Sequence, residues 1–171
     1  MTVETFKIEV LPLKHKLYRF AKRLLKNATE TEDIVQEVFI RLWTRRERLS
    51  EYKSIEAFAM IITKNLCLDN LKSKRNNTDE LTEKYERMTD ATPYEKVELN
   101  DTYNKVQEII NTLPEQQKMI IHLRDIEGYE FNEIAEIVQI SSNTIRVNLS
   151  RARKKVRETL INTYNYEFAK N

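Results

Sequence analysis

The chain has little of the residues that interrupt or cross-link a fold. Its 171 residues include one glycine, three prolines and one cysteine. A single cysteine excludes an internal disulfide and a cysteine-based zinc site. No apolar run approaches the length of a membrane span, and the N-terminus lacks the character of a signal peptide. The abundant Lys, Glu, Leu and Ile, with little glycine and proline, favour an all-α protein. The lack of a membrane span, a signal peptide and paired cysteines predicts that it is located in the cytoplasm. Cys67, which lies between two leucines, is expected to be a small core residue.

Positive and negative charge are segregated along the chain. The net charge is +2, but residues 1–76 carry +6, residues 77–101 carry −5 and residues 102–171 carry +1. Within this acidic stretch, the residues up to Ala91 also lack apolar periodicity, as flexible connectors do. We therefore expect two small helical domains, namely an N-terminal helical bundle at 1–76 and a C-terminal helix-turn-helix four-helix domain at 92–165, joined by a flexible acidic linker at 77–91 and followed by a tail at 166–171.

The stretch from Phe131 to Arg157 predicts a helix-turn-helix whose second helix binds DNA. Apolar residues at three- and four-residue spacing give each helix one buried face, and Ser141 or Ser142 can cap the second helix. No acidic residue occurs between Ser141 and Arg157, while six of the residues there are basic. Such a helix can enter the major groove and contact phosphates on both sides. The alternative is an amphipathic helix that only exposes its charges to solvent.

A regular helix is expected to begin at a capping box formed by Thr29 and Glu32. Its outward side presents Asp33 and Glu37 together with Ile40, and an apolar residue in that setting suits docking onto another protein. An ordinary exposed isoleucine remains the alternative. Periodicity predicts further helices over 6–26, from 55 to 74 after a loop whose Ser54 is the cap, from Thr92 to Leu113, and from Pro114 to a left-handed cap at Gly128.

Three segments carry motifs that can be compared with a known family. They are Asp33-Ile34-Val35-Gln36-Glu37-Val38-Phe39 with Leu42-Trp43, then Lys64-Asn65 with Asp69 and Lys72-Ser73-Lys74-Arg75, and then Leu113-Pro114 through Glu133-Ile134-Ala135 to Arg153. In this order they resemble the polymerase-binding, minus-ten and minus-thirty-five elements of the extracytoplasmic-function group of alternative sigma factors of bacterial RNA polymerase. The resemblance covers the chain from about Phe6 to Leu160.

The resemblance implies a role for each segment. Residues that would bind core polymerase are Asp33, Gln36, Glu37, Ile40 and Arg41. Residues that would bind the minus-ten element are Tyr52, Lys53, Ser54, Lys64, Asn65, Asp69, Lys72, Lys74 and Arg75, with Tyr52 as the candidate for stacking on an extruded base. Residues that would bind the minus-thirty-five element are Ser142, Asn143, Thr144, Arg146, Val147, Ser150, Arg151, Arg153 and Lys154.

The function implied is that of a sigma factor, which binds core RNA polymerase and directs promoter recognition, promoter opening and transcription initiation. Its implied partners are the largest and second-largest polymerase subunits, promoter DNA and an anti-sigma factor, with no membrane insertion and no small-molecule ligand. The sequence predicts no enzyme, cofactor or metal site, because His15 and His122 are isolated and no glycine-rich phosphate loop occurs. The alternative function is a free-standing regulator with an N-terminal sensing or dimerising domain.

Overall fold

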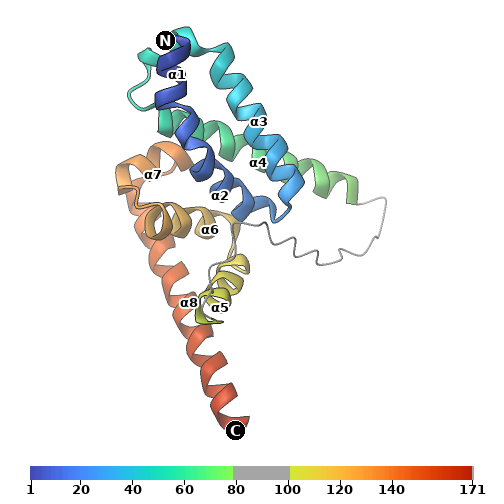
Figure 1. Cartoon of the computed structure of the whole chain (residues 1–171). Coiled ribbons are helices and arrows are strands. Elements are labelled where there is room, and N and C mark those ends of the chain that lie inside the picture. Colours follow the sequence, from blue (N-terminus) through green and yellow to red (C-terminus); the bar gives the residue numbers. More distant parts are fainter. Residues whose placement is uncertain (79–100, 171) are drawn as a thin grey trace.

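A computed structural model of the chain describes residues 1–78 and 101–170, which form helices joined by short turns (Figure 1). The chain begins with α1 (Val3–Glu9), a 3-10 turn η1 (Leu11–Leu13) and α2 (Lys14–Leu25). The prediction of one continuous helix over 6–26 is therefore wrong. Pro12 explains the break, since it has no amide hydrogen to donate and its ring clashes with the preceding helical turn. A left-handed Lys26, with φ of 61°, ends α2.

The first half continues with α3 (Ala28–Thr44), a 3-10 turn η2 (Arg46–Glu51) and α4 (Ile55–Thr78). The expected cap at Thr29 is replaced by Asn27, whose side chain accepts a hydrogen bond of 3.0 Å from the Glu30 amide. The predicted cap of α4 is confirmed, because Ser54 Oγ accepts from the Ala57 amide at 3.1 Å. Helix α4 includes residues 77 and 78 of the predicted linker, and the rest of that linker lies outside the described residues.

The second half contains α5 (Asp101–Asn111), α6 (Glu115–Ile121), a π-helical turn η4 (His122–Ile126), α7 (Phe131–Val138) and α8 (Ser142–Lys170). Gly128 has φ of 78° in the turn before α7, which matches its predicted left-handed conformation. The expected helix start at Thr92 lies outside the described residues. The backbone of the predicted tail is helical as far as Lys170, because α8 continues through it.

Each half has a helical core. In the first half α2, α3 and α4 pack on one another and bury Leu17, Phe20 and Leu42. Cys67 is also fully buried, and burial raises the pKa of its thiol to about 12, so its prediction as a core residue is confirmed. In the second half α8 packs on α5, α6 and α7. Among the described helices, none is both long and apolar enough to cross a membrane.

The prediction of an all-α protein with two small helical domains is confirmed, and the structure adds a direct contact between the two. Helix α7 packs on α4 and α6 packs on α2, so that segments far apart in the sequence lie side by side (Figure 1). The buried apolar residues of both halves form one continuous cluster. The long α8 projects away from this contact with its C-terminal part (Figure 1).

Candidate nucleic-acid interface

The predicted helix-turn-helix is formed by α7 and α8. Gln139 takes the left-handed conformation, with φ of 61°, and makes the tight turn between them. Ser141 is the cap, because its Oγ accepts a hydrogen bond of 3.2 Å from the Thr144 amide. Ile145, Leu149 and Ala152 are buried, as the periodicity predicted. Helix α8 is therefore held by one apolar face while the opposite face stays in solvent.

Most of the residues predicted to bind the minus-thirty-five element lie together on that solvent face. Val147 is 47% exposed, which is high for an apolar side chain inside a regular helix. Ser142 is half-buried, and its hydroxyl donates to Asn132 Oδ1 at 3.3 Å, so it joins the starts of the two helices. The exposed members of the predicted set are Asn143, Thr144, Arg146, Val147, Ser150, Arg151, Arg153 and Lys154.

One aromatic ring organises the start of this surface. The guanidinium groups of Arg124 and Arg146 each lie over the ring of Phe131, both at 4.8 Å from its centroid. Sequence reasoning selected Arg146 but missed Arg124 and Phe131. Neither residue could be selected from the sequence, because Arg124 lies outside the helix-turn-helix and Phe131 has the position of an ordinary core residue.

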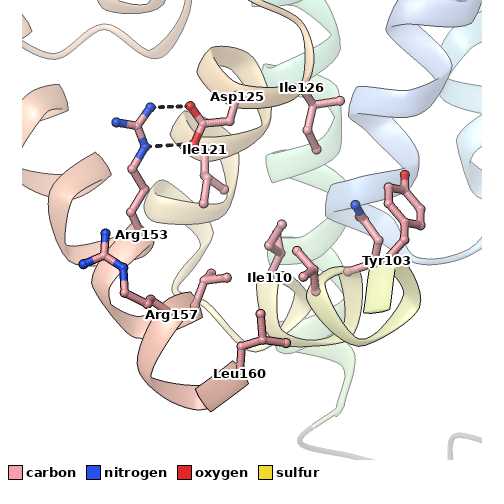
Figure 2. Close-up of a pocket in the computed structure, with 11 residues that line it drawn as sticks. Tyr103, Ile110, Ile121, Asp125, Ile126, Arg153, Arg157 and Leu160 are labelled. Carbon is pink, nitrogen blue, oxygen red and sulfur yellow. Dashed lines mark hydrogen bonds and ion pairs between the residues drawn. The ribbon is translucent and has the colours of Figure 1, made fainter. Parts of the chain in front are cut away.

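Arg153, one of the predicted DNA-binding cations, already has a carboxylate partner. Its Nε and Nη2 donate to the two oxygens of Asp125 at 3.0 and 2.5 Å. Figure 2 shows this pair at the edge of a groove of about 640 Å³ between α5, η4 and α8, whose floor includes Ile110 and Ile121. Sequence reasoning missed the groove, because its walls come from elements that are separated along the chain. If Arg153 contacts DNA as predicted, its pair with Asp125 has to be weakened or broken, which costs free energy.

The predicted minus-ten surface contains a stacked aromatic pair. The rings of Tyr52 and Phe58 are 3.9 Å apart at an interplanar angle of 17°. Tyr52 is 38% exposed and also lines a hollow of about 350 Å³ together with Arg45, Arg48 and Glu51. The two arginines were not among the predicted residues. Together the stack and the hollow offer an aromatic face beside positive charge, which is the combination that binds an unpaired base.

Lys64, which was predicted to bind the minus-ten element, is buried in this structure. It is only 4% exposed, and burial lowers the pKa of its ammonium group. A contact with DNA would require its side chain to leave the core. The packing of α4 on α2, α3 and α7 was not visible in the sequence, where Lys64 is one basic residue of a helix. Ser54 is also engaged, as the cap described above. The other predicted residues at solvent are Tyr52, Lys53, Asn65, Asp69, Lys72 and Arg75, whereas Lys74 is half-buried.

Two of the remaining minus-ten cations form ion pairs. Lys74 Nζ pairs with Glu30 of α3, and Arg75 Nη2 pairs with Glu115 at the start of α6. The second pair joins the two halves of the chain. A phosphate that contacts Arg75 would therefore compete with a carboxylate of the other half for its guanidinium group.

The predicted docking face for polymerase is open to solvent on α3. Asp33, Gln36 and Arg41 are exposed, and Ile40 is 60% exposed between them. Glu37 is half-buried, and its Oε1 accepts a hydrogen bond of 2.7 Å from Arg41 Nε one turn later. The face thus presents an apolar centre ringed by groups that can form hydrogen bonds.

A buried carboxylate fastens the two halves together. Arg19 of α2 donates to both oxygens of Glu127 at 2.8 and 2.7 Å, and His122 Nε2 lies 3.4 Å from the same carboxylate. The Glu127 side chain is 3% exposed. Burial alone would raise its pKa, but the polar contacts with His122 and Arg19 outweigh burial and lower the pKa to about 2. Glu127 is therefore ionised at neutral pH.

A second polar link lies beside it. The Tyr129 hydroxyl donates to Glu56 Oε1, and Lys16 Nζ lies 2.5 Å from the same oxygen. Burial, and then the hydrogen bond to Glu56, raise the pKa of Tyr129, so the phenol remains a donor. The contact between the halves is thus partly made of specific polar groups from α2, α4 and the turn before α7.

Comparison with known proteins gives consistent matches along both halves. A family model for sigma-70 region 2 matches residues 10–77, and one for sigma-70 region 4 matches residues 103–156. The chain is 28% identical over 157 residues to the ECF RNA polymerase sigma factor SigW of Bacillus subtilis, covering 86% of this chain and 84% of that one. It is 30% identical over 148 residues to SigE of Mycolicibacterium smegmatis, covering 85% of this chain but 57% of that one.

Two solved structures have a similar fold. The sigma factor RpoE in complex with the anti-sigma factor NepR from Bartonella quintana superposes with a TM-score of 0.78 at 24% identity, covering 94% of this chain and 98% of that one. CnrH in complex with the cytosolic domain of CnrY gives a TM-score of 0.66 at 19% identity, covering 93% and 89%. Both matches therefore extend over the two halves of this chain.

Proposed function

The chain belongs to the extracytoplasmic-function group of the sigma-70 family, whose members direct promoter-specific transcription initiation. We propose that separate surfaces of its described residues bind core polymerase, the minus-ten element and the minus-thirty-five element. The observation that carries the proposal is the order of the matches, because the region 2 and region 4 models fall on the two helical domains, each with a solvent-facing surface of suitable chemistry. The chain has no catalytic role in this proposal. It lends recognition to RNA polymerase, which performs the chemistry.

The docking face on α3 binds core RNA polymerase. Ile40 provides an exposed apolar centre, and Asp33, Gln36 and the Glu37–Arg41 pair surround it. An apolar centre with a polar rim is the arrangement of a stable protein interface. We assign this face to the largest polymerase subunit and expect the second-largest subunit to make further contacts with the chain.

The surface around Tyr52 receives a base of the minus-ten element when the promoter opens. Phe58 holds the Tyr52 ring by stacking, and the hollow beside it carries the charges of Arg45 and Arg48. Unstacking a base costs a few kcal/mol, and aromatic stacking can return about 1–3 kcal/mol per base. Positive residues along the same half then contact the strand backbone, namely Lys53, Lys72, Lys74 and Arg75, with Asn65 and Asp69 beside them.

The solvent face of α8 reads the minus-thirty-five element in the major groove. Asn143 and Ser150 can form hydrogen bonds with base edges, Val147 can contact a thymine methyl, and Arg146 can bind a guanine or a phosphate. Arg151 and Lys154 extend the positive face along the helix. The burial of Ile145 and Leu149 supports this assignment because it fixes which side of α8 is free.

An anti-sigma factor is a further expected partner. One similar solved structure holds the sigma factor RpoE together with the anti-sigma factor NepR, and the other holds CnrH together with the cytosolic domain of CnrY. A partner of this kind would regulate the present chain by covering its polymerase- or DNA-binding surfaces. We place all of this work in the cytoplasm, where polymerase and chromosome meet.

Run-off transcription with purified bacterial core polymerase tests the proposal. Core polymerase alone, core polymerase with this protein, and the protein alone are compared on a library of promoter sequences. We expect a transcript from a restricted set of templates only when both proteins are present. The absence of any protein-dependent transcript, or tight sequence-specific DNA binding by the protein without polymerase, would contradict it.

A further inference from the structure

The start of α7 holds the Phe131 ring in a fixed place. Glu130 is the N-cap of α7 and forms a capping box, in which its amide donates to Glu133 Oε2 at 2.8 Å. Phe131 is therefore the first helical residue, and its half-buried ring packs against the edge of the hydrophobic core. A ring fixed by both its backbone and its packing can serve as a platform for a mobile side chain.

Arg124 fastens the ring from the π-helical turn. Its Nη1 donates to the Tyr129 carbonyl at 2.7 Å and lies 3.1 Å from Glu130 Oε2, while its guanidinium lies over the Phe131 ring. Three contacts thus fix the Arg124 guanidinium, namely the Tyr129 carbonyl, the Glu130 carboxylate and the Phe131 ring. It is part of the support for the ring and has its own carboxylate partner.

Arg146 is in the opposite situation. It is exposed near the start of α8, and no carboxylate among the described residues lies within ion-pair distance of it. The contact that the structure gives its guanidinium is the face of the Phe131 ring at 4.8 Å. A cation over an aromatic face is attracted by the quadrupole of the ring, and an arginine can stack there with its hydrogen-bond donors still directed outward.

We propose that Phe131 is a positioning residue for upstream-element recognition, which holds the Arg146 guanidinium flat and aimed toward the DNA before DNA arrives. The proposal rests on the assignment of the α8 solvent face to the minus-thirty-five element. Without the ring, Arg146 would have to be ordered when DNA binds, and this would weaken binding. Phe131 itself touches no base in this proposal and acts only through Arg146.

A double-mutant cycle in the reconstituted holoenzyme tests it. Affinity for a promoter fragment with its upstream element is measured at several salt concentrations for wild type, Phe131→Met, Arg146→Ala and the double variant. Phe131→Met removes the ring and keeps much of its apolar volume. We expect it to weaken binding about two- to fivefold when Arg146 is present, as a cation–π contact at an exposed site implies, and to have no effect in the Arg146→Ala background.

Two further variants serve as controls. Phe131→Tyr restores a ring and should restore the affinity, while Val156→Ala removes packing from α8 without touching the ring and should show no coupling to Arg146. Equal losses for Phe131→Met in both Arg146 backgrounds would show that the ring acts by packing and would overturn the proposal. So would no loss at all, or a loss for Phe131→Tyr as large as for Phe131→Met.

A measurement on the unmodified free protein tests the geometry without relying on a variant that folds. In an NMR spectrum, the Arg146 side-chain methylene signals should be shifted by the ring current, with Arg146→Lys used for assignment. Unshifted signals would overturn the proposal. Failure of the proposed function is distinguishable, since wild-type holoenzyme would then show no dependence on the upstream element while the ring-current shift persisted.

Discussion

Replacing Glu127 by Gln should strongly destabilise the protein at neutral pH. Gln keeps the size of the side chain and one acceptor oxygen, but it removes the negative charge that faces Arg19 across the contact between the two halves. The cationic side chain of Arg19 would then face a neutral group at a site where the carboxylate is almost completely buried. The Arg19 side chain is 51% exposed and can regain solvent, so the loss arises mainly from the favourable contacts of the buried Glu127 carboxylate with Arg19 and His122.

The shifted pKa of Glu127 sets the size of the effect. A fall from 4.5 to about 2 corresponds to about 3 kcal/mol of stability at pH 7. Because the folded-state pKa is depressed, this contribution is fully present above the unfolded pKa and is lost as pH falls through the folded one. It should be about 1.5 kcal/mol at pH 3 and should vanish below about pH 2.

Urea unfolding followed by circular dichroism at pH 7, 5, 4 and 3 measures this dependence. The quantity of interest is the difference in unfolding free energy between wild type and Glu127→Gln at each pH. Glu136→Gln is the matched control, since Glu136 is an exposed carboxylate on α7, and its difference should stay within about 0.5 kcal/mol. If the Glu127→Gln difference is small at pH 7, or if it does not shrink between pH 5 and pH 3, the account of the buried pair is refuted.

Four further outcomes are expected. Glu37→Lys should weaken binding to core polymerase in a pull-down, since it reverses a charge on the docking face and repels Arg41; unchanged binding would show that the face lies elsewhere. Arg146→Ala should weaken holoenzyme binding to the upstream element by about 1–3 kcal/mol, and an unchanged affinity at several salt concentrations would remove it from the contact surface. Tyr52→Ala should make the free energy of promoter opening, measured by permanganate reactivity, less favourable by about 1–3 kcal/mol, whereas Tyr52→Phe should leave it unchanged. The protein alone should bind promoter fragments poorly in a mobility-shift assay, and tight specific binding would favour the free-standing regulator.

Local patterns were sufficient to predict the helix-turn-helix. The spacing of Ile145 and Leu149 selects the buried face of α8, and therefore its free face, without knowledge of any other part of the chain. The cap at Ser54 was predictable for the same reason, because a cap depends on a few neighbouring residues. The break at Pro12 was also a local event, and it was missed because the apolar spacing on either side of it continues as if the helix were whole.

Contacts between distant segments account for what the sequence did not predict. Lys64 is a basic residue of an otherwise suitable helix, and its burial depends on the packing of α4 on its neighbours α2, α3 and α7, which no local pattern indicates. The partners of Arg153 and Arg75 are likewise set by the tertiary fold. The distribution of charge along the sequence therefore predicted that the DNA-binding surfaces are positive, but it did not show which of their cations form ion pairs in the fold.

The π-helical turn between α6 and the helix-turn-helix makes the number of residues there a structural requirement. In η4 the Glu127 amide donates to the His122 carbonyl at 3.0 Å, so this turn contains one residue more than an α-helical turn. Deleting one residue between His122 and Ile126 would allow an ordinary helix but rotate everything after it by about 100° relative to α6. Glu127 would then point away from Arg19, and the DNA-reading helix would face a different direction. We therefore expect that substitutions in η4 are tolerated more readily than any change in its length.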